Sequence, residues 1–304
     1  MKTQQSKSKM NKWLLSFIMK YNQLFPSRLY IKLLFRLRMG YKLNLKNPKT
    51  FNEKLQWLKL YDNKPEYTNM VDKALAKEYV KPIIGEKYVV PTYGVWDTPE
   101  EVDFDVLPEQ FVLKTTDGGG SLGVIICTDK TKMNKNEVVS KLHQVMKQDI
   151  YGKLREQPYK NIKKRILAEQ YLSDDTTSVK GDLNDYKFYC FNGNVTFCEV
   201  ITGRHTNKQI DFFDLDWKHQ PFTFQGRTFA DNQVQKPECF DEMIEIADKL
   251  CKDKPYSRID MYVVQGKVYF GEITFFPASG FRGFSPDEWN NKLGDMIQLP
   301  LKRK

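Results

Sequence analysis

Apolar and polar positions change their spacing along the chain, which divides it into a helical first part and a strand-rich remainder. Leu55 and Leu58 belong to an early apolar set with helical spacing. Thr50, followed by Glu53 three residues later, matches a capping box and predicts the start of this helix. A second helix is predicted over residues 70–80, so the chain before residue 88 is expected to be helical.

Short β-branched and aromatic runs from residue 88 onward predict strands. Asn192-Gly193-Asn194 and Gln265-Gly266 separate two pairs of these runs, which predicts two antiparallel hairpins. Short strand-like pieces are predicted at 89–91 and 93–96. The further predicted strands are 111–114, 123–127, 166–172, 186–191, 195–201, 258–264 and 267–273, and the predicted helices are 136–151 and 239–251. Paired strands with helices between them indicate an α+β architecture with mainly antiparallel sheets.

Composition narrows the class of protein. A chain of 304 residues with 40% hydrophobic side chains can bury a large core and is expected to fold as a globular protein. The five cysteines form no CxxC pair and no metal-ligand spacing, and no secretory leader is recognisable, so we expect reduced thiols in the cytoplasm. Three histidines disfavour a histidine-rich zinc site.

The positive charge belongs to one end of the chain. Residues 1–50 hold twelve of the 48 basic side chains and no acidic one, so the other 254 residues hold 36 basic against 38 acidic side chains. A uniformly basic surface for nucleic acid is therefore not expected. Residues 10–41 mix apolar and basic side chains without an apolar run of the ~20 residues that a bilayer span needs.

Two interpretations of this basic segment remain open and are compatible. One is a basic amphipathic helix lying on an anionic membrane surface. The other is a helical hairpin packed on the rest of the fold, with its arginines in solvent. The expected location is the cytoplasm, with a peripheral position at the inner face of the membrane if residues 1–50 bind lipid.

A glycine loop between two predicted strands is the first candidate for chemistry. Lys114 ends an apolar strand, and Gly118, Gly119, Gly120 and Ser121 follow before the next strand begins. Glycines let backbone N–H groups approach an anion closely, and a lysine adds positive charge beside them. The order of a Walker A loop is absent. A plain glycine hairpin would explain the glycines but not the lysine.

An acidic hairpin is the second candidate. Arg258 and Asp260 share one face of a predicted strand, and Glu272 and Thr274 share one face of the next. Two adjacent carboxylates repel each other unless a cation intervenes, and oxygen ligands without imidazole or thiolate suit Mg²⁺. The arginine could hold a developing phosphoryl charge. The alternative is a surface Arg–Asp pair with an unrelated glutamate.

These residues together resemble the ATP-grasp superfamily, in a pattern close to that of D-alanine–D-alanine ligases. A narrower resemblance is to the ATP-grasp branch named for teichuronopeptide biosynthesis (TupA-like), which sits among surface-polysaccharide enzymes. It is carried by Asn47-Pro48-Lys49-Thr50-Phe51-Asn52-Glu53-Lys54-Leu55-Gln56-Trp57, Asp185-Tyr186-Lys187-Phe188-Tyr189-Cys190-Phe191-Asn192-Gly193 and Asp214-Leu215-Asp216-Trp217. The resemblance implies two α+β lobes that clamp a nucleotide: residues 67–165 with the glycine loop and 166–304 with the metal site. Residues 1–66 form a helical basic segment in place of the usual Rossmann-like first domain.

The resemblance also implies a role for each site residue. ATP phosphates would be bound by Lys73, Lys114 and Lys218 and covered by Gly118, Gly119, Gly120 and Ser121. Adenine would be received by Glu169 and the backbone near Tyr171 and Leu172, and the ribose by Asp185. Mg²⁺ would be held by Asp260, Glu272 and Thr274, the last replacing the usual asparagine. Arg258 and Lys114 would stabilise the transferred phosphoryl group.

The implied activity is a Mg·ATP-dependent carboxylate–amine ligase that works through an acyl phosphate. Its expected partners are a glycan or sugar acid and an amine, within cell-surface polysaccharide or capsule biosynthesis. Three other interpretations remain open: a glycosyltransferase that uses Asp214-Leu215-Asp216 as a metal motif, a phosphotransferase on the same fold, and a non-catalytic membrane-bound scaffold. His205 is a candidate substrate contact or base, and a solvated loop histidine is the alternative.

Overall fold

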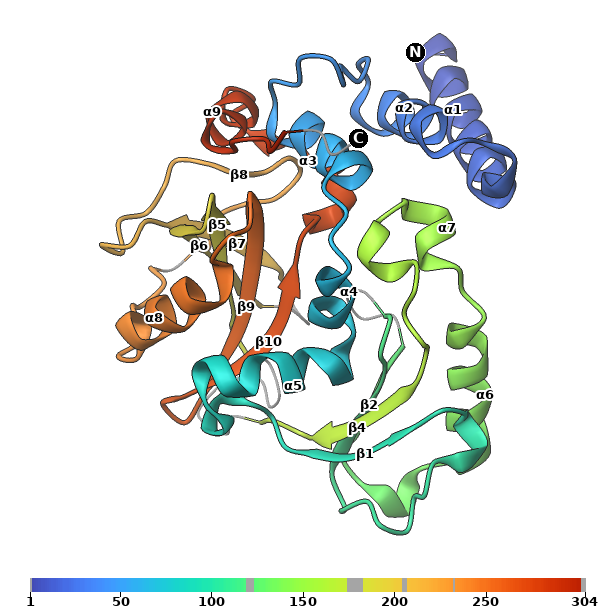
Figure 1. The fold of residues 1–304 in the computed structure, drawn as a ribbon, viewed down its shortest axis with the longest axis vertical. Helices are drawn as coiled ribbons and strands as arrows, with labels where there is room; N and C mark the ends of the chain where they lie inside the picture. Colours follow the sequence, from blue (N-terminus) through green and yellow to red (C-terminus); the bar gives the residue numbers. More distant parts are fainter. Residues whose placement is uncertain (1, 119–122, 174–182, 204–206, 232, 302–304) are drawn as a thin grey trace.

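Within the part of the chain that the structure describes, two larger antiparallel sheets and one two-stranded sheet are surrounded by helices (Figure 1). The computed structural model describes residues 2–118, 123–173, 183–203, 207–231 and 233–301. Its helices are α1 (Lys2–Lys20), α2 (Ser27–Met39), α3 (Phe51–Tyr61), α4 (Glu66–Val71), α5 (Lys73–Ile84), α6 (Lys135–Met146), α7 (Ile150–Leu154), α8 (Phe240–Cys251) and α9 (Trp289–Met296). None of these described helices combines the length and the apolar character needed to cross a bilayer.

The small sheet has the order β1-β4-β2-β3. Its strands are β1 (Thr92–Trp96), β2 (Phe111–Thr115), β3 (Val124–Cys127) and β4 (Ile166–Gln170). Phe111 and Leu113 from β2, Ile166 from β4 and Leu142 from α6 are fully buried in one separate apolar core. The small lobe therefore closes around its own core.

The large sheet has the order β10-β9-β5-β6-β7. Its strands are β5 (Asp185–Phe191), β6 (Asn194–Thr202), β7 (Gln209–Phe213), β9 (Tyr256–Val264) and β10 (Lys267–Thr274), and a short β8–β11 pair (Thr223–Phe224 with Phe284–Ser285) lies beside it. Phe188 and Ile259 of the sheet share one core with Phe240 of α8 and with Tyr30 and Leu34 of α2. The N-terminal helices are therefore packed on the large lobe.

Several predicted elements are confirmed. The capping box at the start of α3 is present, since the Thr50 hydroxyl accepts from the Glu53 N–H at 3.2 Å and the Glu53 carboxylate accepts from the Thr50 N–H. Asn192 and Gln265 have positive φ values of 52° and 51°, as expected of tight hairpin turns. The predicted α+β class with antiparallel sheets is correct.

The boundary predicted at residue 166 is misplaced. The strand Ile166–Gln170 pairs with β2 and β1, so it completes the small sheet. Helix α5, predicted to lie in the small lobe, packs instead on the large one, because Ala76 and Val80 belong to the large core. The apolar spacing of a helix predicts which of its side chains are buried. It does not predict which of two cores they join.

A β-bulge at Gly271 decides which side chains of β10 face the core. Before it, Val268 and Phe270 are buried; after it, Ile273 is buried and Glu272 is turned away. The register confirms the irregularity, since Phe270 and Glu272 oppose two consecutive residues of β9. A Cβ at Gly271 would lie 3.0 Å from the Asp260 carbonyl oxygen. The bulge therefore turns Glu272 onto the polar face of the sheet.

Candidate active site

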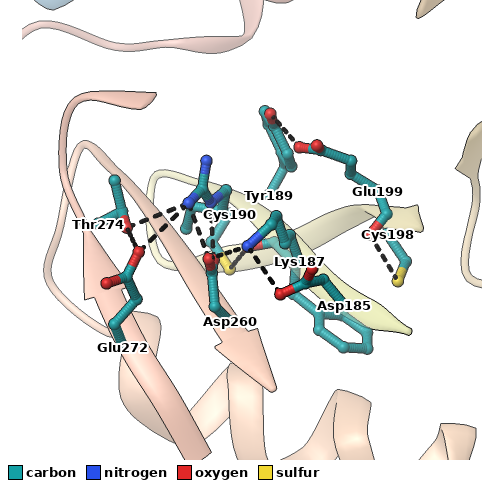
Figure 2. A network of polar contacts seen from close by, with 11 residues as sticks. Asp185, Lys187, Tyr189, Cys190, Cys198, Glu199, Asp260, Glu272 and Thr274 are labelled. Atoms are coloured by element: carbon teal, nitrogen blue, oxygen red, sulfur yellow. Dashed lines mark hydrogen bonds and ion pairs between the residues drawn. The ribbon is translucent and has the colours of Figure 1, made fainter. Parts of the chain in front are cut away.

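A row of charged residues crosses four neighbouring strands of the large sheet. Glu199 on β6 is opposite Lys187 on β5, Lys187 is opposite Asp260 on β9, and Asp260 is opposite Glu272 on β10. Side chains in register on adjacent strands lie close together on one face. Figure 2 shows the Lys187 ammonium meeting the Asp260 carboxylate, with the Glu272 carboxylate beside Thr274 on the next strand.

Asp260 is the centre of this row. Its two carboxylate oxygens accept from the Arg258 guanidinium, each at 2.7 Å, in a bidentate pair. The Lys187 ammonium also donates to Asp260. Burial raises the pKa of Asp260, but Arg258 and Lys187 outweigh it, so the net shift is downward. Asp260 is therefore a buried aspartate that stays ionised.

The neighbouring residues complete the cluster. Thr274 lies opposite Arg258, accepts from it at 3.3 Å and donates to Glu272 at 3.1 Å. Burial lowers the pKa of Lys187, but the carboxylates of Asp260 and Asp185 outweigh it and the net shift is upward. The large sheet thus presents two cations, Arg258 and Lys187, and four carboxylates on one face; the carboxylates belong to Asp185, Glu199, Asp260 and Glu272.

A second charged group joins β2 and β4 of the small sheet to helix α5. Glu169 on β4 pairs with Lys114 on β2 and, at 2.7 Å, with Lys77 on α5. Lys77 also donates to the Val90 carbonyl at 2.9 Å. Burial lowers the pKa of Lys114, but Glu169 and other anionic neighbours outweigh it, so the net shift is upward. Lys114 is therefore protonated, and it lies on the strand that leads into the glycine loop.

Lys73 connects helix α5 to the start of the glycine loop. Its backbone N–H donates to the Thr116 carbonyl at 3.0 Å, and its ammonium donates to the Gly118 carbonyl. Asp72 caps the helix by accepting from the N–H groups of Ala74 and Leu75. The described stem of the loop is thus held by α5.

The two charged groups influence each other electrostatically. Glu272 on β10 raises the pKa of both Lys73 and Lys114, although burial is the largest influence on each and lowers it. Net, the pKa of Lys73 falls and that of Lys114 rises. Glu272 and the two lysines are therefore coupled electrostatically, although they come from three separate parts of the chain.

The predicted oxygen ligands fit Mg²⁺ in chemistry. No cluster of three or more His, Cys, Asp or Glu suited to a metal occurs within the described residues. Mg²⁺ needs only one or two protein carboxylates when phosphates and waters fill the other positions. The Glu272 side chain is 39% exposed and can offer both oxygens. Asp260 already accepts three hydrogen bonds, which leaves about one acceptor position.

The comparisons with known proteins can be set beside this geometry. A protein-family model described as TupA-like ATP-grasp matches residues 53–298. The chain belongs to the TupA-like ATP-grasp family. The predicted family is therefore confirmed, and with it the ATP-grasp fold. A comparison with curated proteins finds no match.

Solved structures with similarity to this ATP-grasp chain include three enzymes. The D-alanine–D-alanine ligase of Bacillus anthracis complexed with ATP is 19% identical, with a TM-score of 0.42, over 75% of this chain and 63% of that one. The N5-carboxyaminoimidazole synthetase of Staphylococcus aureus complexed with ADP is 15% identical, with a TM-score of 0.42, over 91% and 59%. The L-amino acid ligase of Bacillus licheniformis is 10% identical, with a TM-score of 0.43, over 84% and 55%. This chain spans less than two thirds of the length of each.

The structure does not bring every predicted ATP-grasp residue to the site. Lys218 lies in an exposed turn after β7, at the far edge of the large sheet, and pairs with Asp216 at 3.2 Å. Asp214 accepts from the N–H groups of Asp216 and Lys218, so the Asp-x-Asp sequence is a locally bonded surface turn. Lys218, which was predicted to bind the triphosphate, therefore lies at the edge of the large sheet away from Asp260. The same holds for Asp214 and Asp216, the metal motif of the glycosyltransferase alternative.

Other predicted residues have simpler outcomes. Asp185 is buried at the start of β5, 3.7 Å from the Lys187 ammonium. Tyr171 and Leu172 follow β4 directly and are half-buried. The predicted loop residues Gly119, Gly120 and Ser121, and also His205, lie outside the described residues.

Two site lysines carried no role in the sequence interpretation. Lys187 lies two residues after Asp185, so both share a strand face, and that spacing was a usable signal. Lys77 lies four residues after Lys73 and shares a helix face with it. Both spacings can be read from the sequence. Neither shows that β5 pairs with β9 or that α5 contacts β4 through Lys77 and Glu169.

A tight turn follows strand β10. Ala278 and Ser279 have positive φ values of 46° and 54°, an unfavourable backbone conformation for these residues. Lys59 of α3 donates to the carbonyl and hydroxyl oxygens of Ser279 at 2.7 and 2.6 Å, and Gln56 donates to the same carbonyl at 3.0 Å. Burial lowers the pKa of Lys59 to about 7. Helix α3 therefore fixes the chain where it leaves β10.

Proposed function

We propose that the protein is an ATP-dependent carboxylate–amine ligase that works through an acyl phosphate. The observation that carries this proposal is the pair of charged groups on the two sheets, Lys114 with Glu169 and Arg258 with Asp260. Helix α5, which contacts β10, adds Lys73 at the stem of the glycine loop. A triphosphate lying between the lobes would meet lysines on one side and carboxylates with Arg258 on the other. This arrangement suits phosphoryl transfer, in which positioning and charge stabilisation supply most of the catalysis.

We assign each step of this reaction to residues of the two charged groups. Lys73 and Lys114 hold the ATP phosphates while a substrate carboxylate oxygen forms a bond to the γ-phosphorus and the bond to ADP breaks. Arg258 offsets the charge that develops on the phosphoryl oxygens. An amine then attacks the acyl carbon, phosphate departs with the bonding electrons, and the amine proton passes to solvent. Bound through Glu272, Asp260 and Thr274, Mg²⁺ would supply further neutralisation of phosphate charge.

The substrate class proposed is a sugar acid of a cell-surface glycan, joined to an amino acid or another amine. Support comes from membership of the TupA-like ATP-grasp family and from the basic first 50 residues, which suit an anionic partner. No nucleophilic serine or cysteine is required for this chemistry, because the acyl group is carried by phosphate.

Hydroxylamine trapping tests the reaction class. With ATP, Mg²⁺ and a panel of uronic acids, we expect ADP release and a hydroxamate detectable by mass spectrometry, since hydroxylamine intercepts an acyl phosphate. ADP release with a phosphorylated hydroxyl and no hydroxamate would instead assign a phosphotransferase. Binding of a UDP-sugar without any binding of ATP would assign a glycosyltransferase.

We further propose that the helical hairpin α1–α2 lies on an anionic membrane surface. Large apolar side chains are exposed on it, with Trp13 at 66% and Leu24 at 70%, next to the basic residues Lys20 and Arg28. Exposed apolar groups flanked by cations match the headgroup region of an anionic bilayer. The location that follows is cytoplasmic and peripheral.

Vesicle co-sedimentation tests this placement. We expect binding to phosphatidylglycerol vesicles but not to phosphatidylcholine vesicles, and at least tenfold weaker binding for Trp13→Glu combined with Leu24→Glu. Val106→Glu, which places the same charge at an exposed apolar position of the small lobe, is the matched control. If the double variant binds the vesicles as tightly as the wild type, the α1–α2 hairpin is not the membrane-binding surface.

A further inference from the structure

A polar pocket of about 550 Å³ lies beyond the turn that follows β10. Its walls come from the end of α2, the start of α3, helix α9 and residues 281–283. Figure 1 shows α3 and α9 at the end of the large sheet where β10 finishes. The volume lies within the range of small-molecule sites. None of the residues predicted from the sequence for ATP or Mg²⁺ lines it, so it is distinct from the nucleotide site.

Two arginines in this pocket have no carboxylate partner among the described residues. The Arg38 guanidinium lies 4.9 Å from the ring centroid of Phe281, and that of Arg282 lies 4.6 Å from the ring centroid of Phe224. Burial lowers the pKa of both arginines, and Arg227 lowers that of Arg282 further. One N–H of Arg38 donates to the Met19 sulfur at 3.5 Å. The remaining N–H groups of the two partly desolvated guanidiniums can donate to an anionic oxygen ligand.

The remaining lining suits hydroxyl groups. Gln225 and Asn291 supply amides, Tyr41 supplies a phenol and Asp287 supplies a carboxylate that can accept from a hydroxyl. The same Asp287 would repel a dianionic phosphate more strongly than a singly charged carboxylate. An occupant with one carboxylate and several hydroxyls satisfies both sets of groups.

The pocket is rigidly connected to the catalytic strand. Only six residues separate Thr274 of the charged cluster from Phe281 of the pocket, and the turn between them is fixed by Lys59 and Gln56. Gly280 within this turn has a φ of 63°, and a Cβ there would lie 2.5 Å from the Gln56 amide nitrogen. A ligand held by Arg282 is therefore held at a set position relative to the cluster.

We propose that this pocket binds a uronate residue of the glycan substrate, with Arg38 and Arg282 holding its carboxylate and Asp287 and the amides holding its hydroxyls. This inference rests on the proposed ligase function for the identity of the substrate, but not for the binding itself. In this arrangement the uronate in the pocket is a recognition unit, and the chain that carries it extends toward the charged cluster.

Titration calorimetry with the full-length protein tests the inference without turnover. We expect digalacturonate to bind, uncharged maltose to bind at least tenfold more weakly, and glucose 1-phosphate to bind more weakly than digalacturonate. Arg282→Ala and Arg38→Ala should each weaken digalacturonate at least tenfold while leaving the affinity for ATP unchanged. Arg36→Ala is the matched control, because Arg36 lies on the same helix, is exposed and does not line the pocket.

Three outcomes of the calorimetry would count against the pocket proposal or the ligase function. Digalacturonate affinity that is absent, or that neither pocket variant changes, overturns the proposal. Tighter binding of glucose 1-phosphate than of digalacturonate would replace the carboxylate ligand with a phosphate and also overturn it. Wild-type protein that binds digalacturonate through both arginines but does not bind ATP would sink the proposed function and leave the pocket assignment standing.

Discussion

Replacing Lys114 with alanine is expected to lower ATP-dependent turnover at least a hundredfold without unfolding the protein. Loss of one fixed charge that stabilises a transferring group costs about 3 kcal/mol of transition-state stabilisation, which corresponds to about this factor. The fold should survive because Glu169 keeps its second cation, Lys77, at 2.7 Å. ADP release measures turnover, and thermal unfolding reports on the fold.

Lys163→Ala provides the control for this change. Lys163 lies in the same lobe, is exposed and pairs with Asp97 at 2.6 Å on the surface. Its removal should leave ADP release within about twofold, since an exposed ion pair contributes little. Full turnover by Lys114→Ala would contradict the placement of the triphosphate beside the glycine loop.

Replacing Asp260 with asparagine is expected to abolish turnover and also to lower the free energy of unfolding by about 3–5 kcal/mol. The change leaves the buried cations Arg258 and Lys187 facing a neutral amide, and removing one member of a buried ionic group costs about this much. Urea unfolding measures the loss. Asp248→Asn, which removes a surface carboxylate on α8, is the control and should change stability by less than about 1 kcal/mol.

The pH dependence of this difference has a definite sign. The folded-state pKa of Asp260 is lowered, so its carboxylate contributes fully above the pKa of unfolded aspartate, about 3.9, and less as the pH falls through the lower folded value. The gap between wild type and Asp260→Asn should therefore be constant from about pH 5 to 7 and shrink below about pH 4. A gap that does not shrink in acid would show that the aspartate is not ionised in the fold.

Local patterns predicted much of this molecule. Thr50 and Glu53 located the start of α3, and Asn192 and Gln265 located two hairpin turns, because each of these signals acts over a few residues. Arg258, Asp260 and Glu272 were grouped correctly as well, since they lie on one predicted hairpin. Local chemistry was sufficient wherever the partners were close in the sequence.

Contacts between distant segments were not predictable in the same way. Lys187 reaches Asp260 only because β5 pairs with β9, a neighbour 73 residues away along the chain. Lys218 was given a phosphate role by its sequence context, but β7 carries it to the opposite edge of the sheet. The arginine pocket draws on both ends of the chain. Single-sequence periodicity holds no information on which strands become neighbours.

The bulge at Gly271 has a consequence for how this strand tolerates change in length. Shortening β10 by this one residue would exchange its two sides, so that Glu272 would enter the apolar core and Ile273 would lie on the polar face of the sheet. Gly271 thus determines which side chains of β10 face the polar side of the sheet. A one-residue insertion or deletion here is expected to abolish activity even if every charged residue is retained.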